Sequence, residues 1–405
     1  MSMIALEGAM TDAPARTAAQ GFRAETLRGA ASIAAVHAEW QALADAVAAP
    51  NWSLLPAAHD VWLRQLRRPD SSPLITVRDP AGRLRAVFAL MRDRVRRGPA
   101  MAPRFDYDPA DGRLLGPGAR RLFPLRQVAA ATSMPATLAW GAPLCRPEDL
   151  GPAIDAVAGA ILAERGWDVA VLSAAMPDEF ALWQAAFARR GHRLHRQALD
   201  RVVQNVAPVR PFSALYAGQP MKVRQNLRRA ERFASEMGVG FRFIEGSAAV
   251  AAEFPLIRRI AEASWKAAGR AGNPLNIPYD ARQQAYVEGL FTSPLLKGQP
   301  VLGIAEGPEG PCNVLLLLQA GGTVTALLTF WDGRYDRCSP GLLLLGRSID
   351  LAVARGALRY DLNATAPWVR HVANERTEVV NAVLFSHGVW GRLMEAVALR
   401  CRRLR

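Results

Sequence analysis

The sequence of 405 residues is 50% hydrophobic and 21% charged, as in a globular protein long enough for two sizeable cores. No apolar run reaches the roughly 18 residues of a membrane-spanning helix, and residues 1–20 lack the basic start and apolar stretch of a secretory signal. The formal net charge is +14, but only three of the 50 basic residues are lysine and no nucleic-acid-binding motif occurs. GC-rich codon usage explains this arginine excess better than a nucleic-acid partner, and an electropositive groove for a polyphosphate is the alternative.

The cysteines indicate the redox environment in which the protein works. Four are present, Cys145, Cys312, Cys338 and Cys401, and they form neither a Cys-x-x-Cys pair nor a Cys/His spacing typical of metal sites. Such usage is typical of a reducing compartment, so we expect a cytoplasmic protein without a metal site.

The first half alternates helical and extended patterns after a mobile lead-in that we expect over residues 1–23. Periodicity predicts helices over 33–49, 59–66, 150–165 and 178–190, and strands over 74–77, 84–91 and 167–172. Asp79-Pro80-Ala81-Gly82 is a hairpin signal between the first two strands. Residues 98–123, rich in Pro, Gly and Arg, predict a long loop. No helix of this half begins with a convincing phosphate-binding sequence, although residues 120–127 are hard to interpret.

Residues 202–211 cross into the second half, which opens with a basic helix predicted over 222–237. Its apolar face repeats at helical spacing, and the remainder carries Lys222, Arg224, Arg228, Arg229 and Arg232. These side chains either form a solvated face or contact a phosphate, for which the arginine fork is suited. Further along, the pattern predicts a strand over 239–244, a helix over 254–267 that ends in Trp265-Lys266, and a β-hairpin formed by 298–318 and 321–330.

A second helix of this half begins with Ser-Pro-Gly. Ser339 is a good N-cap, Pro340 suits the first helical position, and Gly341 lets another group approach the first turn. The helical pattern continues to Gly356, a typical residue for the end of a helix. Its free N–H groups and partial positive charge could bind a phosphate, or the cap could simply begin a packed helix.

The last part of the chain holds the candidate acid–base residues. A strand predicted over 357–362 contains Asp361, which could act as a base, orient an acceptor, or bond its own turn. His371 follows in a polar loop; histidine suits acid–base work near neutral pH, but a lone loop histidine is often merely at the surface. Glu375 is a weaker base candidate. A strand over 379–385 and an amphipathic helix over 388–404 with a basic tail follow. Its basic part, 392–405, is either a solvated terminal helix or a membrane-surface contact.

The order of these elements, together with the start Ser339-Pro340-Gly341-x-Leu343, resembles the cellulose-biosynthesis-associated (CelD/BcsL-like) GNAT acyltransferases, close to Fem-type tandem-GNAT proteins. The resemblance covers roughly residues 24–395. It implies an α/β (α+β) fold of two tandem GNAT-like halves, each a mixed β-sheet flanked by helices. The implied N-terminal half, 24–205, lacks a cofactor, and the C-terminal half, 206–405, is the acyltransferase half with the cofactor site.

The resemblance also implies roles for individual residues. Acyl-CoA, with acetyl-CoA as the first choice, would be held at its pyrophosphate by Ser339, Pro340, Gly341, Leu342 and Leu343, assisted by Arg224 or Arg228. Asp361 or His371 would handle the proton. The acceptor side would be shaped by Trp265, Lys266, Tyr279, Asn363, Trp368 and Arg370. The family continues after the Asp361 position with Gly-x-x-x-Tyr-Lys; this chain departs from that pattern, and Trp368 and Arg370 could replace its aromatic and basic members.

These observations predict an N-acyltransferase that moves an acyl group from acyl-CoA to the amine of a small molecule or amino sugar in polysaccharide biosynthesis. Acyl transfer needs donors for the carbonyl and a base for the amine but no covalent nucleophile, and Cys338 has no sequence-near histidine to activate it. Two alternatives stay open: a Fem-type aminoacyl-tRNA-dependent transferase, and a catalytically silent accessory protein of exopolysaccharide synthesis. The sequence leaves the oligomeric state open.

Overall fold

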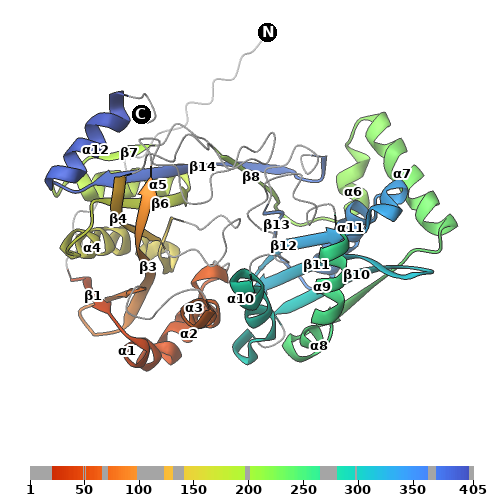
Figure 1. Cartoon of the computed structure of the whole chain (residues 1–405), viewed down its shortest axis with the longest axis horizontal. Helices are drawn as coiled ribbons and strands as arrows, with labels where there is room; N and C mark the ends of the chain where they lie inside the picture. The colour runs from red at the N-terminus through yellow and green to blue at the C-terminus, as the bar shows by residue number, and fades with distance from the viewer. Residues whose placement is uncertain are drawn as a thin grey trace, which may run out of the picture.

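The computed structural model describes residues 21–48, 50, 52–65, 72–97, 123–130, 141–196, 201–264, 281–296, 299–363 and 371–400. Figure 1 shows two halves side by side, joined by strands that run between them. In the described part of the chain, one continuous sheet has the order β1-β2-β3-β4-β6-β14-β8-β13-β12-β11-β10-β9, with β5 on β3 and β7 on β14.

The N-terminal half begins with β1 (Arg23–Leu27), α1 (Ala30–Ala35), α2 (His37–Ala46) and α3 (Pro56–Gln65). It continues with β2 (Leu74–Arg78), β3 (Leu84–Arg97), β4 (Phe123–Ala130), β5 (Leu144–Cys145) and α4 (Leu150–Ala163), and then with β6 (Val169–Ala175), α5 (Pro177–Ala188) and β7 (Leu194–Arg196).

The remaining elements begin with β8 (Arg201–Val206), α6 (Phe212–Ala217), α7 (Met221–Glu236), β9 (Gly240–Glu245), α8 (Ser247–Ala252), α9 (Phe254–Ala263) and α10 (Ala281–Thr292). They continue with β10 (Pro300–Gly307), β11 (Gly310–Ala320), β12 (Thr323–Trp331), α11 (Pro340–Ala354), β13 (Arg359–Asp361), β14 (Glu375–Phe385) and α12 (Val389–Arg400).

The two halves repeat one topology. Four antiparallel strands, β1 to β4 in one half and β9 to β12 in the other, end in a parallel pair, β4 with β6 and β12 with β13. A helix connects each parallel pair, α4 in the first half and α11 in the second, as a parallel connection requires. This architecture confirms the predicted fold class of two mixed-sheet halves.

Strands β8 and β14 merge the two sheets into one. Residues Glu375–Val379 of β14 pair with β8, whereas Val380–Phe385 pair with β6. Figure 1 shows β14 crossing from one half to the other. The domain boundary expected at 205/206 falls inside β8 and stays a prediction.

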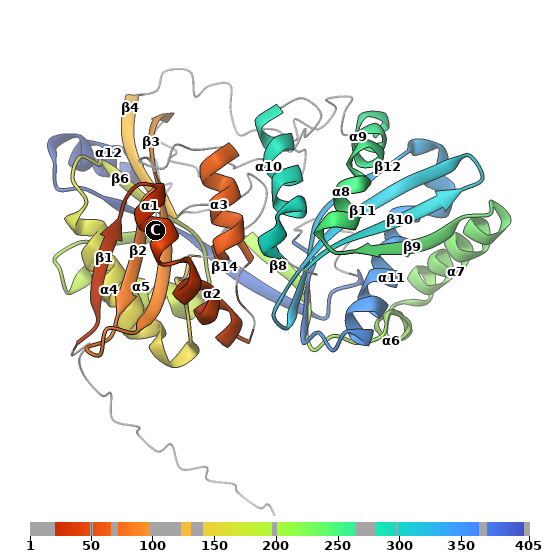
Figure 2. The same cartoon turned by 90° about the horizontal axis from the view of Figure 1, so that it is seen from below.

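Apolar clusters cover both faces of the sheet. Residues of α6, α7 and α11 pack on one face of the C-terminal strands, and residues of α8, α9 and α10 pack on the other. In the first half, α4 and α5 cover one face, and α1 to α3 and α12 contribute to the cluster on the other. Helices α3 and α10 face each other where the halves meet (Figure 2). Among the described residues, no helix has the length and apolar character needed to cross a bilayer.

Some elements differ from the sequence-based expectation. The helix predicted over 33–49 is broken at Val36 into α1 and α2, and the hairpin predicted over 298–330 is three antiparallel strands. Strand β4 was not predicted because its eight residues follow a Pro- and Gly-rich stretch and alternate weakly. The helix predicted from Pro340 is confirmed as α11, and Gly356 ends it with φ 67°.

Candidate active site

The two halves enclose a cleft of about 670 Å³. Its N-terminal wall comes from the segment after α2 and from the segment that leads into α4. The C-terminal half contributes Thr323, Thr325, Arg359 and Asp361, all from the parallel pair β12 and β13. The N-terminal lining residues are Ala46, Val47, Ala48, Pro50, Trp52, Leu54, Ala142, Pro143, Leu144, Cys145, Arg146, Pro147, Glu148, Leu150, Met176 and Glu179.

The β11–β12 hairpin tip fixes the N-terminal wall to the C-terminal half. The backbone N–H of Gly322 donates to the carbonyl oxygen of Ala48 at 2.7 Å. Gly321 has φ 53°, and a Cβ there would lie 2.6 Å from the same oxygen, so only glycine allows this close approach. The Gly322 carbonyl in turn accepts from the backbone N–H groups of Leu358 and Arg359, at 2.8 and 3.1 Å. One turn therefore aligns the cleft wall with β13.

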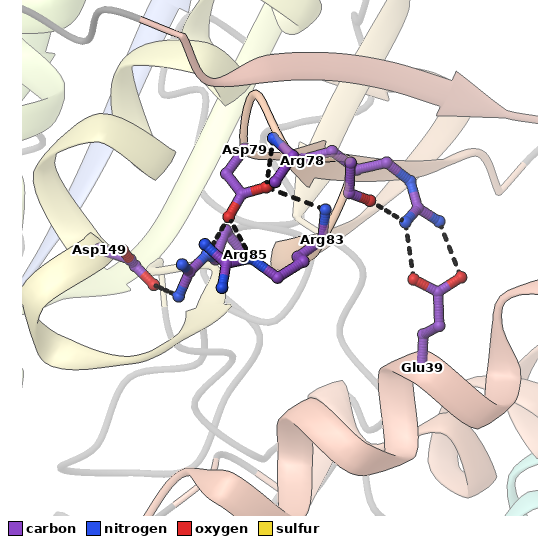
Figure 3. A network of polar contacts seen from close by, with 8 residues as sticks. Glu39, Arg78, Asp79, Arg83, Arg85 and Asp149 are labelled. Atoms are coloured by element: carbon purple, nitrogen blue, oxygen red, sulfur yellow. Dashed lines mark hydrogen bonds and ion pairs between the residues drawn. The ribbon is translucent and has the colours of Figure 1, made fainter.

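A polar network connects the β2–β3 hairpin to α2 and to the start of α4 (Figure 3). Asp79 accepts from the backbone N–H of Arg83 at 2.9 Å and from the Arg85 Nε at 2.9 Å. Burial opposes ionisation of Asp79, but these hydrogen bonds and that from the Arg83 side chain lower its pKa to about 2. Arg85 also lies 3.5 Å from Asp149, at the start of α4, and Arg78 binds Glu39 of α2 at 2.6 Å (Figure 3). The network therefore ties both wall segments to one hairpin.

Among the described residues of the C-terminal half, Asp361 is the carboxylate that lines the cleft. Arg359 and Asp361 are two residues apart on β13 and therefore share a face of the sheet. Asp361 is only 6% exposed, and its Oδ1 accepts from the backbone N–H of Asn363 at 2.8 Å. Burial raises its pKa to about 6, against the smaller opposing effects of the Asn363 hydrogen bond and of Arg359. A buried carboxyl with such a pKa can accept a proton near neutral pH.

A polar network from β8 and β14 holds this carboxyl. With the buried amide of Asn205 oriented so that both its ends are satisfied, its nitrogen donates to Asp361 Oδ1 at 3.2 Å. The Asn205 oxygen accepts from Arg359 Nη2 at 2.6 Å, and the same Nη2 donates to Glu375 Oε1 at 3.0 Å. Glu375, expected as a weaker base, is thus a partner of Arg359.

Strand β13 ends at Asp361, opposite Thr325 of β12. The two strands pair only over Thr323–Thr325 and Arg359–Asp361, whereas β12 continues to Trp331. Leu327 is a bulge on β12, because Ala326 and Leu328 pair with consecutive residues of β11. The bulge interrupts the ladder between β12 and β11, the neighbour on the side away from β13.

The α11 start follows β12 through a 3₁₀ helix over Gly333–Cys338. Ser339 occupies the N-cap position, but its backbone is left-handed with φ 48° and its side chain makes no capping bond, which corrects the expected side-chain cap. A Cβ on Gly341 would lie 3.7 Å from Asn313 Nδ2. Asn313 is fully buried, and its Oδ1 has no hydrogen-bond partner in the described structure. Leu342 is half-buried and Leu343 buried.

The basic helix α7 packs against that 3₁₀ helix and against α11. Arg337 stacks on Phe233 of α7 at 4.2 Å from the ring centroid. Arg224 is half-buried, with its Nε buried and unpaired in the described structure, and Arg228 is exposed. Burial raises the pKa of the Cys338 thiol, and its Sγ donates to the Tyr335 carbonyl, so this cysteine is a packing residue.

The equivalent helix start of the first half differs in charge. Helix α4 follows Arg146 and a 3₁₀ turn over Pro147–Asp149, which places Glu148 and Asp149 at its N-terminus. The first turns of α4 and α11 both lack acidic residues, so the difference lies at the N-cap position, which is Asp149 in α4 and Ser339 in α11. Carboxylates at a helix N-terminus already satisfy its partial positive charge and repel a phosphate.

The other predicted site residues divide in two groups. Asn363 lies next to Asp361, with φ 46°, and His371 is half-buried but is not among the residues that line the cleft. The second group, Trp265, Lys266, Tyr279, Trp368 and Arg370, lies outside the described residues. Among the described residues, no group of three or more His, Cys, Asp or Glu side chains could hold a metal ion.

Comparison with known families bears on the C-terminal half. Residues 221–368 match the family model described as an acetyltransferase (GNAT) domain. This GNAT match begins at α7 and includes β9 to β13 with the α11 start. No curated protein matches the sequence.

Solved structures of similar fold extend over both halves. FemX covers 92% of this chain and all of its own, with a TM-score of 0.57 and 11% identity. The C-terminal domain of a putative lysylphosphatidylglycerol synthetase from Agrobacterium fabrum has a TM-score of 0.53 and 10% identity, covering 92% of this chain and 96% of its own. A conserved protein of unknown function from Bacteroides thetaiotaomicron has a TM-score of 0.53 and 9% identity, covering 86% and 97%. At these identities the likeness establishes the fold alone.

Sequence reasoning did not identify Asn205, Arg359 or the N-terminal wall. Arg359 could have been found, because strand alternation places it on the same face as Asp361. Asn205 and the segment around Ala48 carry no local signal, since each reaches the site through pairing with distant strands.

Proposed function

We propose that the protein is an N-acyltransferase that uses acyl-CoA and binds its amine acceptor in the cleft between the halves. The observation that carries the proposal is the position of Asp361, a buried carboxyl that lines this cleft at the end of β13. The GNAT match over residues 221–368 supports the reaction class.

In the proposed reaction, the amine nitrogen forms a bond to the thioester carbonyl of acyl-CoA and loses a proton, the carbon–sulfur bond breaks, and CoA leaves as a thiolate that takes up a proton. Asp361 accepts the amine proton, because its raised pKa of about 6 keeps it ionised yet basic near neutral pH. Asn205 bridges the Asp361 carboxyl and the Arg359 guanidinium and so restrains the carboxyl. Oxyanion stabilisation requires a hydrogen-bond donor near the acyl oxygen, and we assign this role to the β12 backbone around Leu327.

The α11 start is the proposed pyrophosphate site. Its backbone N–H groups and partial positive charge suit a diphosphate, and Gly341 keeps its first turn open. Arg224 on the adjacent α7 has an unpaired, buried Nε, which fits a further phosphate contact. The acidic start of α4 argues for a single cofactor site, in the half we assign to residues 206–405.

The cleft walls guide the choice of acceptor. The wall from the first half is mainly apolar, with Trp52 and Leu144, and carries Glu148 and Glu179. Burial raises the pKa of Glu179, which accepts from the Met176 N–H at 2.8 Å. Apolar faces with a few carboxylates suit a small amine or an amino sugar. The sequence resemblance favours a role in cytoplasmic polysaccharide biosynthesis.

Calorimetry with acetyl-CoA, longer acyl-CoAs and free CoA tests the cofactor site directly. We expect saturable binding to the full chain and its loss in Gly341→Trp, whose ring would fill the space above the first turn. Gly341→Ala is the matched control and should bind normally, because its Cβ meets Asn313 only at 3.7 Å, an ordinary contact. Normal binding by Gly341→Trp, or sugar binding without any CoA binding, contradicts the proposal.

A second candidate is Fem-type aminoacyl transfer from tRNA. The exposed arginines of α7, Arg228, Arg229 and Arg232, favour it because they form a basic surface beside the α11 start. Consumption of aminoacyl-tRNA by the purified protein, without CoA binding, would select this candidate.

A further inference from the structure

Helix α12 exposes an unusual amount of apolar surface. Of the seven exposed large apolar side chains among the described residues, four lie on it: Val389 (85% exposed), Trp390 (49%), Leu393 (48%) and Leu399 (40%). The opposite face, with Gly391, Met394 and Ala398, is buried against the sheet. The helix is therefore apolar on both its inner and its outer face, whereas a surface helix normally turns polar residues outward.

The charges of α12 are arranged asymmetrically. Val389, Leu393, Ala396 and Arg400 recur at spacings of four and three and so share the outward face, with Arg392 beside them. The helix contains one carboxylate, Glu395, which binds the fully buried His195 of β7 at 2.6 Å. The outer face thus combines apolar side chains with arginines and presents no carboxylate from the helix itself.

We propose that α12 docks the protein on an anionic lipid surface, with its axis in the plane of the interface. An apolar stripe flanked by arginines, with a tryptophan at its edge, is the composition that inserts between headgroups and pairs with their phosphates. A second copy of this chain fits poorly, because both partners would bring arginines to the contact and the whole chain has a net charge of +14. The inference does not depend on the proposed acyl transfer.

The position of α12 suits this role. Figures 1 and 2 both place it at the outer end of the N-terminal half, at the opposite end of the molecule from α7. Docking there would leave the α11 start accessible.

Vesicle co-sedimentation of the full chain tests the proposal. We expect binding to vesicles that contain phosphatidylglycerol, weaker binding to pure phosphatidylcholine, and a decrease with added salt. Leu393→Gln should weaken binding to the anionic vesicles by at least about fivefold, because an inserted apolar side chain becomes polar. Met221→Gln is the matched control: Met221 is 65% exposed and begins the most basic helix, α7.

The outcomes are distinct. Binding lost in Leu393→Gln and kept in Met221→Gln, with unchanged unfolding midpoints for both, supports α12 as the docking surface. No binding of the wild type, equal loss in both variants, or equal binding to neutral vesicles overturns it. A dimer in solution that Leu393→Gln dissociates, without vesicle binding, would assign the face to a second copy instead.

Discussion

At the residue scale, Asp361 should make stability depend on pH. Its folded-state pKa, about 6, exceeds the ordinary 3.8, so the folded protein holds this proton more tightly than the unfolded chain. The contribution of Asp361 to the free energy of unfolding is most favourable below pH 4 and is lost as pH rises toward and through 6. We expect Asp361→Asn to be more stable than wild type at pH 8, by up to about 3 kcal/mol, because an amide keeps the acceptor for Asn363 without a buried charge.

Denaturant unfolding at pH 8 and at pH 4 provides the measurement and its internal control. The difference between Asp361→Asn and wild type should be largest at pH 8 and small near pH 4, where the folded-state carboxyl is neutral and that of the unfolded chain is about half ionised. A difference of the same size at both values, or a variant less stable at pH 8, would mean that its neighbours already stabilise the charged carboxylate.

At the element scale, the β11–β12 turn should be sensitive to a single methyl group. In Gly321→Ala the new Cβ would lie 2.6 Å from the Ala48 carbonyl oxygen and 2.7 Å from Pro50 Cδ, so the cleft wall must move. We expect a loss of unfolding free energy of about 2–3 kcal/mol, the sum of left-handed backbone strain and this contact. Chemical denaturation measures it.

The control variant separates the cost of the Cβ contact from the cost of left-handed backbone strain. Gly356 has a similar φ, 67°, and a Cβ at this position would meet no atom within 4 Å, so Gly356→Ala should cost only the strain, about 1 kcal/mol. Equal losses in the two variants would show that the tip does not press on the N-terminal wall.

The elements also show what sequence patterns can predict. Helix α11 was predicted with its ends because Pro340 and Gly356 are local signals that act within one turn. The residues around Val380 favour a strand and were predicted as one. Nothing in them indicates that β14 begins at Glu375 or that it pairs with strands of both halves. Asp361 was predicted from its place after the helix, whereas Asn205 reaches it from 156 positions earlier through β8–β13 pairing. Local signals thus give elements, and the assembled site depends on long-range pairing.

At the scale of the whole molecule, the shared strand β14 should make the halves interdependent. Fragments 1–210 and 211–405 separate the chain in the coil between β8 and α6. Alone, 211–405 would expose Val383, Phe385 and Met394, which belong to a cluster that includes Val169 and Val171 of β6. We expect neither fragment to unfold cooperatively by circular dichroism, and the pair to form a soluble complex when co-expressed, because pairing buries both surfaces. A monomeric 211–405 with a cooperative transition would show instead that the GNAT-matching half folds independently and that β14 only attaches it to its neighbour.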